Sequence, residues 1–388
     1  MFRRYTISEI GDIISGATPK TNVLTNFGGE IPWLTPADLS GYTEKYISHG
    51  ARNLTQQGYD SCSTHLIPAG TVLLSSRAPI GYVAIAKNEI CTNQGFKSIV
   101  PKAFVNSEFL YYQLKSLKNT LQNLGSGTTF KELSAKKLAT VQVVIPSLEE
   151  QKSIVSKIEE LFSKLDASVA ELKTAKEKLK VYRQAVLKEA FRCAESFVPF
   201  GNITDARLGK MLDKEKNTGT PQRYLRNINV RWFNFDLSDL LEMRIGLDEI
   251  EKYSIQYGDL VICEGGEPGR CAVWEEQEPI FYQKALHRVR FTDGSNPKFY
   301  MYYLWFAAQT GQLKRFFTGT GIKHLTGQSL VKVPVPSADK NTQDHAVSEI
   351  EFRLSVCDSI EQTVDTSLQK AEALRQSILK QAFEGRLN

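Results

Sequence analysis

The sequence lacks the features of several common classes of protein. Its six cysteines are scattered, without a C-x-x-C pair or a nearby histidine cluster, so it predicts neither a zinc site nor a disulfide framework. No apolar run approaches the ~20 residues that cross a bilayer, and no charged-then-apolar leader follows Met1. We therefore expect a cytoplasmic protein that does not bind membranes. Aromatic residues at 10% and apolar residues at 41% exclude a disordered chain.

Catalytic motifs are also scarce. There is no Asn- or Asp-Pro-Pro-aromatic loop to hold a flipped base, and no G-x-x-x-x-G-K-[ST] loop to bind ATP. The segment Phe317 to Gly321 (FTGTG) fits the pattern of a methyl-donor-binding turn, but it follows a polar, basic segment instead of a buried strand. The five histidines have neither metal-ligand nor triad spacing. The sequence thus predicts no catalytic residue and no metal site.

What the sequence does contain is an internal repeat. The segment Arg183 to Phe191 (RQAVLKEAF) returns as Arg375 to Phe383 (RQSILKQAF), at an offset of 192 residues in a chain of 388. The same offset relates further pairs: Asp166 and Asp358, Gln151 and Gln343, and Leu133 and Leu325. A tandem pair of like domains offers two similar surfaces, which suits a target that is itself divided into two parts.

Each half of the chain begins with a strand-rich segment that also contains a helix. Short β-prone runs between turn signals predict strands at 71–74, 82–86, 98–100 and 141–145, and again at 259–263, 271–274 and 287–291. Apolar periodicity predicts buried helices at 107–118 and near 299–309. We therefore predict an α+β fold with two mixed α/β domains, at residues 1–147 and 198–336.

A charged, amphipathic pattern follows each of these domains, at residues 148–197 and 337–388. Apolar residues recur there in steps of four and three, which is typical of a coiled-coil seam. The predicted seam residues are Ile154, Ile158, Leu161, Leu165, Leu172 and Leu179 in the first segment, and Ile350, Leu354, Val364, Leu374 and Ile378 in the second.

A helix over residues 148–191 would be ~65 Å long and could not bury its apolar stripe alone. We expect its partner to be the second helix, over residues 338–383, although pairing with another molecule competes with this solution. The prediction is an antiparallel coiled coil with pseudo-twofold symmetry, which would place the two domains at opposite ends. Parallel packing would place them side by side, and the sequence alone leaves it open.

These features resemble the specificity subunit of type I restriction-modification systems. The resemblance rests on IPSLEEQKSIVSKIEELFSKLD at Ile145 to Asp166 and above all on LRQSILKQAFEGRL at Leu374 to Leu387. GDIISGATPK from Gly11 and IPWLTPADL from Ile31 are similar to the opening of the family's first recognition domain. The resemblance implies a sequence-specific DNA-binding subunit with two target recognition domains, each of which reads one half of a bipartite site in double-stranded DNA.

The same resemblance implies several partners. The helices would act as a spacer and would also dock two methyltransferase (modification) subunits, and restriction subunits, which translocate and cut DNA, could join them. S-adenosylmethionine and ATP would be bound by those partners, so this chain would need no cofactor and would be non-catalytic.

Candidate DNA-binding residues are side chains with fork or bidentate geometry near predicted loops. In the first domain they are Lys20, Thr35, Arg77, Gln94 and Lys97, together with Thr128 and Lys131 beside a glycine-rich turn. In the second domain they are Lys210, Arg223, Arg226, Arg231, Arg270, Gln283 and Lys284, together with Lys323 and His324 beside the corresponding turn. Each is equally well explained as a solvated surface residue, because roughly half of protein–DNA hydrogen bonds go to phosphate and sugar.

Two interpretations from other classes stay open. The chain could be a DNA methyltransferase or nuclease with an unrecognised active site, or a coiled-coil adaptor that binds only proteins. The sequence identifies neither the recognised bases nor the length of the spacer between the half-sites. It also leaves open whether a restriction subunit is present and whether the isolated chain is a monomer.

Overall fold

The computed structural model describes residues 3–77, 79–127, 131–194, 196–213 and 217–387 of the chain. The chain divides into two compact units. Unit 1 comprises Met1–Leu172 and Thr366–Asn388, and unit 2 comprises Lys173–Asp365. Each unit therefore joins one strand-rich domain to part of each long helix. The division into four sequence segments with the boundaries given above stays a prediction.

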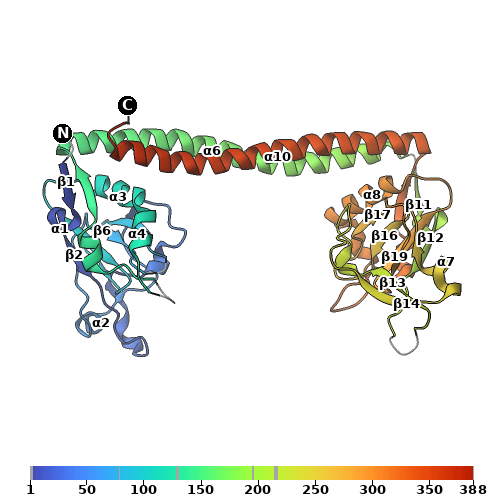
Figure 1. Cartoon of the computed structure of the whole chain (residues 1–388), viewed down its shortest axis with the longest axis horizontal. Helices are drawn as coiled ribbons and strands as arrows, with labels where there is room; N and C mark the ends of the chain where they lie inside the picture. The colour runs from blue at the N-terminus through green and yellow to red at the C-terminus, as the bar shows by residue number, and fades with distance from the viewer. Residues whose placement is uncertain (1–2, 78, 128–130, 195, 214–216, 388) are drawn as a thin grey trace. The chain divides into compact units, whose positions relative to one another are not determined.

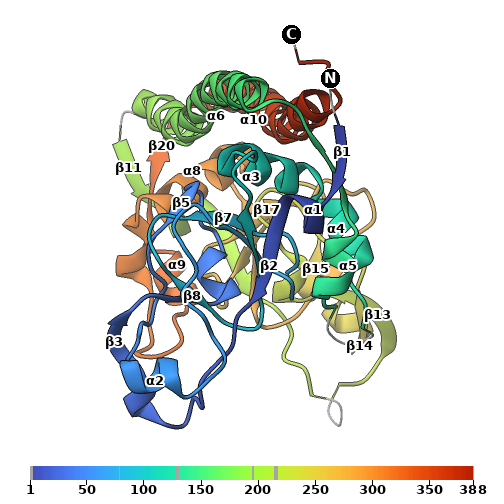
Figure 2. The ribbon, with the colours of Figure 1, turned by 90° about the vertical axis from the view of Figure 1, so that its left-hand side faces the viewer.

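Unit 1 is built on a five-stranded sheet with the order β2-β9-β6-β7-β5, accompanied by the two-stranded pairs β1-β10 and β4-β8 (Figure 1). Its strands are β1 Arg3–Thr6, β2 Gly11–Ser15, β3 Phe27–Ile31, β4 Trp33–Leu34, β5 Tyr46–Ile47, β6 Val72–Leu74, β7 Val83–Ala86, β8 Cys91–Thr92, β9 Lys97–Pro101 and β10 Gln142–Ile145. Its short helices are α1 Ile7–Ile10, α2 Gln56–Asp60, α3 Ser107–Ser116, α4 Lys118–Leu124 and α5 Ala135–Ala139. Figures 1 and 2 show α3 against the long helices and α2 at the far end of the unit.

Unit 2 contains two four-stranded sheets, with the orders β12-β19-β16-β17 and β14-β13-β18-β15, and the pair β11-β20. Its strands are β11 Ser196–Pro199, β12 Thr204–Leu208, β13 Thr220–Leu225, β14 Leu241–Ile245, β15 Ser254–Ile255, β16 Leu260–Cys263, β17 Cys271–Val273, β18 Ile280–Tyr282, β19 Leu286–Phe291 and β20 Pro334–Ser337. Its short helices are α7 Ile250–Tyr253, α8 Pro297–Gln309 and α9 Gly327–Leu330.

The two units share one framework. The order β2-β9-β6-β7 in unit 1 recurs as β12-β19-β16-β17 in unit 2, and the parallel pair β4-β8 recurs as β13-β18. In both units a helix that follows the main sheet, α3 or α8, packs on it with a run of buried aromatic residues. The predicted α+β fold with an internal repeat is confirmed.

The two long helices are α6 (Leu148–Ala190) and α10 (Lys340–Phe383), close to the predicted ranges. In unit 1, Val155 and Ile158 near the start of α6 share a core with Leu379 and Ala382 near the end of α10. In unit 2, Val186 and Leu187 near the end of α6 share a core with Val347 and Ile350 near the start of α10. The helices therefore run antiparallel in each unit, which confirms that prediction.

Ion pairs between the helices follow the repeat. In unit 2 the Arg183 guanidinium donates to Asp358 Oδ1 at 2.6 Å and to Glu361 Oε2 at 2.7 Å. In unit 1 Arg375 pairs with Asp166 and lies 5.0 Å above the ring of Phe162. Arg375 and Asp358 are the repeat equivalents of Arg183 and Asp166. The same arginine–aspartate pair therefore forms in both units, with the arginine on α6 in unit 2 and on α10 in unit 1.

One predicted seam residue requires a correction. Leu374 is 49% exposed, whereas the other predicted seam residues are buried or partly buried. Its repeat equivalent, Tyr182, is similarly exposed, at 47%. Ala371 is the buried residue that precedes this position on the helix face, and the next residue of the seam follows after four residues instead of three. Arg375 therefore occupies the seam, and Leu374 points outward. A search for apolar periodicity overlooks an arginine that buries its stem and pairs its head across the seam.

Buried glutamines attach each domain to its helix. In unit 1 Gln151 Oε1 accepts from the Asn106 N–H at the start of α3 (2.7 Å), and its Nε2 donates to the Phe104 and Pro146 carbonyls, both at 2.9 Å. In unit 2 Gln343 Oε1 accepts in the same way from the Asn296 N–H at the start of α8 (2.7 Å). Each glutamine therefore fixes the angle at which its domain leaves the helix.

Two searches of the described residues found nothing. Among them, no helix is at once long and apolar enough to pass through a membrane. Across the same residues, His, Cys, Asp and Glu side chains form no group of three or more that could hold a metal ion.

Candidate nucleic-acid interface

Five connections meet on one side of the main sheet in unit 1. They are the segment after β2 (16–26), the segment after β4 (35–45), the β6-β7 turn (75–77 and 79–82), the β8-β9 turn (93–96) and residues 125–127 and 131–134. Backbone hydrogen bonds join them, from the Ala17 N–H to the Thr92 carbonyl (3.0 Å), Asn93 to Leu34 (2.8 Å), Ser76 to Gly95 (2.7 Å) and Leu133 to Ser76 (2.8 Å). We call this set of segments the loop cluster of unit 1.

The same four hydrogen bonds recur in unit 2. They run from the Lys210 N–H to the Tyr282 carbonyl (3.0 Å), Gln283 to Leu225 (3.1 Å), Glu264 to Ala285 (2.9 Å) and Leu325 to Glu264 (2.7 Å). They join the segments 209–213, 226–240, 264–270, 283–285 and 317–326, which form the loop cluster of unit 2. The two clusters therefore have one backbone framework, and the bonds show which positions correspond: Asn93 matches Gln283 and Gln94 matches Lys284.

In unit 1 the loop cluster gathers charged side chains around Glu132. Its carboxylate accepts from Arg77 at 3.0 Å and lies 3.8 Å from the ammonium group of Lys97. Arg77 is about half exposed, whereas Lys97 is almost fully buried. Burial lowers the pKa of Lys97 below its ordinary value, and the Glu132 carboxylate opposes that shift. Arg77 is thus held in one orientation while its guanidinium remains accessible.

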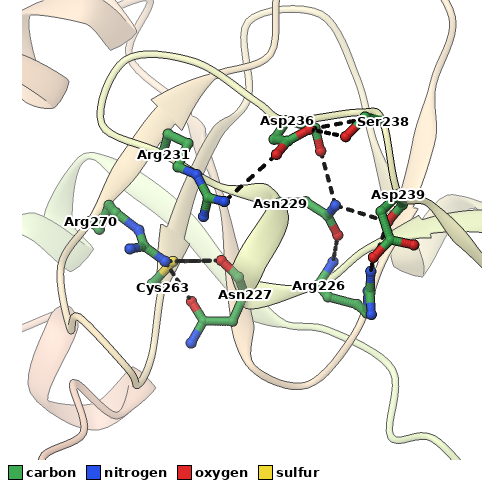
Figure 3. Close-up of polar contacts among 9 residues, drawn as sticks. All are labelled: Arg226, Asn227, Asn229, Arg231, Asp236, Ser238, Asp239, Cys263 and Arg270. Carbon is green, nitrogen blue, oxygen red and sulfur yellow. Dashed lines mark hydrogen bonds and ion pairs between the residues drawn. The ribbon is translucent and has the colours of Figure 1, made fainter. Parts of the chain in front are cut away.

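In unit 2 the segment 226–240 is held rigid by a polar network (Figure 3). The Arg226 guanidinium donates to the carbonyl and the carboxylate of Asp239, at 2.7 and 2.6 Å. Asn229 Oδ1 accepts from the Arg226 N–H at 2.9 Å, and its Nδ2 donates to the carbonyls of Asp236 (2.9 Å) and Asp239 (3.1 Å). The corresponding turn in unit 1 is closed in the same way, by Asp38 accepting from the Thr35 N–H at 2.7 Å.

Arg270 connects this segment to the β16-β17 turn. It donates to the Asn227 carbonyl at 3.0 Å (Figure 3). It also donates to Glu267 at 3.0 Å, and Asn227 Nδ2 donates to the Gly265 carbonyl at 2.5 Å. Cys263 lies beside Arg270, and burial raises the pKa of its thiol to about 11, so the thiol stays neutral. The Arg270 guanidinium is therefore fixed and largely buried, with 16% of the side chain exposed, and its role in the structure is to join the two segments.

Lys210 is the most enclosed of the candidate DNA-binding residues in unit 2. Its ammonium group pairs with the Glu249 carboxylate and lies 5.8 Å from the centre of the Tyr253 ring. The hydrogen bond from Lys210 is the main cause that lowers the pKa of Glu249 below its ordinary value. Lys210 therefore has a structural contact that joins its segment to the segment before β15.

The structure brings most of the predicted DNA-binding residues to the two loop clusters. In unit 1 these are Lys20, Thr35, Arg77, Gln94 and Lys131, with Lys97 next to them as the first residue of β9, whereas Thr128 lies outside the described residues. In unit 2 they are Lys210, Arg226, Arg231, Arg270, Gln283, Lys284, Lys323 and His324. Arg223 is apart from them, because it lies within β13 opposite Glu242. A contact with DNA stays a prediction for all of them.

Sequence reasoning missed the residues that hold these basic side chains. Glu132, Glu249, Asp239, Glu267 and Asn227 orient the five basic residues described above. The i, i+3 spacing of Glu267 and Arg270 was a usable signal, because such a pair can meet within one turn. The other partners are 13 to 55 residues away along the chain and become neighbours only in the folded domain.

Comparison with known proteins finds similar sequences. Residues 2–178 match the family model described as type I restriction modification DNA specificity domain. The type I restriction enzyme MjaIX specificity subunit of Methanocaldococcus jannaschii is 39% identical over 242 residues, which cover 58% of this chain and 55% of that protein. The alignment thus spans little more than half the length of this relative.

Two solved structures share the fold. A chain from a structure of complex assembly and conformational transition in the type I R-M system has a TM-score of 0.76 at 17% identity, covering 99% of this chain and 98% of that chain. The HsdS subunit from Thermoanaerobacter tengcongensis has a TM-score of 0.66 at 16% identity, covering 99% of this chain and 97% of that chain. At these identities the likeness concerns the fold alone.

Proposed function

We propose that this chain is a specificity subunit of the type I restriction-modification family, which binds double-stranded DNA and reads a bipartite site with one loop cluster per half-site. One observation carries the proposal: the clusters share a backbone framework but differ in their side chains. Thr35 corresponds to Arg226, Arg77 to Gly265, Lys97 to His287 and Glu132 to His324. A common framework with different side chains suits two half-sites of different sequence.

We also propose that this chain is non-catalytic and needs no cofactor, and that S-adenosylmethionine and ATP are bound by partner subunits. The FTGTG segment supports this in part. It does not follow a strand, because η7 (Gln312–Phe316) precedes it, and it belongs to a hairpin closed by Thr318 and His324. Methyl transfer by the purified chain without any partner would contradict the proposal. A cytoplasmic location stays a prediction.

DNA binding can be tested at Arg77. We expect the full chain to bind a duplex that carries the site methylated in its host, with an affinity that falls steeply as salt rises. Arg77→Ala should lower that affinity by a factor of about 5 to 150 if the guanidinium reads a base, and should relax selection in one half-site only. Fluorescence anisotropy against salt concentration measures both effects.

The matched control is Lys87→Ala. Lys87 is an exposed cation at the opposite end of β7 from the loop cluster, so we expect its replacement to leave affinity and selection unchanged. Binding without salt dependence, or an Arg77→Ala variant that behaves like Lys87→Ala, would count against this loop cluster as the interface.

Partner docking is proposed on an apolar stripe of α10. Phe352 (65% exposed), Val356 and Ile360 recur every four residues on one face, and the last two line a shallow groove with Val364. Exposed apolar residues grouped in this way indicate a protein interface more strongly than scattered ones do. We propose that a methyltransferase subunit covers this stripe, since the family resemblance in the sequence implies such a partner on the helices.

The stripe lies on only one of the two repeats. Its repeat equivalents on α6 are Glu160, Lys164 and Ser168, of which the first two form an ion pair at 2.6 Å. We therefore expect Phe352→Asp to reduce a complex with two methyltransferase subunits to one with a single subunit, as measured by mass photometry. Gln369→Asp, at an exposed polar position of the same helix, should leave both subunits bound.

A further inference from the structure

A narrow hairpin projects from the loop cluster of unit 2. Thr318 and His324 exchange two backbone hydrogen bonds, of 2.8 and 3.0 Å, which close the hairpin at its base. The next residue, Leu325, is fully buried in the core of unit 2, and its N–H donates to the Glu264 carbonyl at 2.7 Å. The base of the hairpin is therefore firmly anchored.

The tip of this hairpin presents a bulky apolar side chain to solvent. Ile322 is 74% exposed. Gly319 on the opposite arm has φ +93°, and a Cβ there would lie 2.3 Å from the Ile322 carbonyl oxygen, so the arms approach as closely as only glycine permits. The Lys323 ammonium group donates to the Gly319 carbonyl at 2.7 Å and braces the turn. The backbone is thus folded tightly beneath Ile322.

Groups suited to DNA surround the hairpin. The His324 ring packs on Gly265, where a Cβ would lie 3.0 Å from His324 Nδ1. The Gly265 carbonyl accepts from Asn227, whose own carbonyl accepts from Arg270. Ile228, next to Asn227, is also half exposed. The hairpin therefore stands beside the network in which Arg270 and Asn227 hold the loop cluster together.

We propose that Ile322 is a wedge that inserts between stacked base pairs in the half-site bound by unit 2. This proposal deepens the proposed function and depends on it. Isoleucine and phenylalanine are among the side chains that proteins insert between base steps, where they unstack the bases and bend the duplex. The residues before Ile322 in the turn are Gly319, Thr320 and Gly321, which are small enough to let a single side chain enter.

The repeat carries the same pattern in sequence. The segment Ser126 to Lys131 (SGTTFK) aligns with Thr318 to Lys323 (TGTGIK) at the offset of 192, so the residue equivalent to Ile322 is Phe130. Residues 128–130 lie outside the described part of the chain, so the proposal is made for Ile322 alone. In both halves of the sequence, a large apolar residue stands between a Gly-Thr pair and a lysine. This is the pattern expected if each half carries a wedge.

The test uses 2-aminopurine, a base whose fluorescence rises when it is unstacked. It is placed in turn at each position of the half-site read by unit 2, in duplexes bound by the full chain together with its methyltransferase subunits. The methylated adenines are left out as probe positions, because a methyltransferase flips its target base. We expect the wild-type chain to raise the fluorescence severalfold at one step.

Ile322→Ala should abolish that rise and weaken binding roughly tenfold. Ile322→Phe should retain the rise, and Gly319→Ala should reduce it, because the hairpin backbone does not accept a Cβ there. The control is Tyr257→Ala, since Tyr257 is also well exposed (62%) but lies before β16, at the end of that strand opposite the loop cluster.

Two results would overturn the wedge while leaving the proposed function intact. In the first, the wild-type complex binds its site but no probe position brightens. In the second, Ile322→Ala binds and brightens the same step as the wild type. If the wild-type complex shows no salt-dependent binding to the site, the proposed function fails as well, and the two failures are therefore distinguishable.

Discussion

Exchanging residues 1–147 for the corresponding segment of a relative is expected to change one half of the methylated site and to leave the other half as it was. The reason is that the loop cluster of unit 1 lies wholly within this segment, whereas that of unit 2 lies between residues 209 and 326. Methylome sequencing of a host that carries the exchanged chain measures the result directly.

The structure also tells where to join the segments. Residues 146–147 separate β10 from α6, so a junction there interrupts neither element. Phe109 of α3 contacts the Phe383 ring, with centroids 5.2 Å apart, and the exchanged segment must keep an aromatic residue at that position. The control is the reciprocal exchange of residues 198–336, which should change only the other half of the site. A chimera that alters both halves, or a folded one that alters neither, would refute separate reading.

Replacing Gln343 by alanine is expected to produce a large loss of stability in unit 2. Gln343 is 2% exposed, and it accepts from the Asn296 N–H and donates to the Ala338 carbonyl at 2.8 Å. Leaving these two buried groups without a partner costs about 1–3 kcal/mol each, so the free energy of unfolding of unit 2 should fall by about 2–6 kcal/mol. Urea denaturation measures the fall.

Hydrogen exchange locates the effect. The amides at the start of α8, from Asn296 onward, should exchange faster in Gln343→Ala, while those at the start of α3 should not change. Gln151→Ala should give the opposite pattern, because Gln151 makes the equivalent contact with Asn106 in unit 1. Ser348→Ala, at an exposed position of α10, serves as the control. Equal protection of Asn296 in Gln343→Ala and in the wild type would show that the glutamine does not hold α8.

Much of the fold follows from periodicity and repetition. The first long helix was predicted over residues 148–191 and is found at Leu148–Ala190, because a stripe with steps of four and three is visible in the sequence. The sequence alone did not decide whether the two long helices pack parallel or antiparallel. The direction of packing depends on contacts such as that of Arg183 with Asp358, 175 residues apart, and periodicity does not specify which residues of two helices meet.

The loop clusters were harder to predict for a related reason. The sequence shows that Lys97 and Lys210 are basic, but their burial arises from strand pairings that bring distant segments together. The parallel pair β13-β18 joins residues almost 60 positions apart and has no local signal. Candidates could therefore be chosen by residue type, whereas their accessibility and their acidic partners emerge only from the folded domain.

The exchanged arginine and aspartate contacts have a further consequence. Each repeat contains both members of the pair, Asp166 with Arg183 in the first and Asp358 with Arg375 in the second. A shortened gene product with a single repeat would therefore carry everything needed to pair with an identical molecule, Arg183 of each copy meeting Asp166 of the other. Such a homodimer would be isologous, with two identical reading surfaces, and its natural target would be a palindrome.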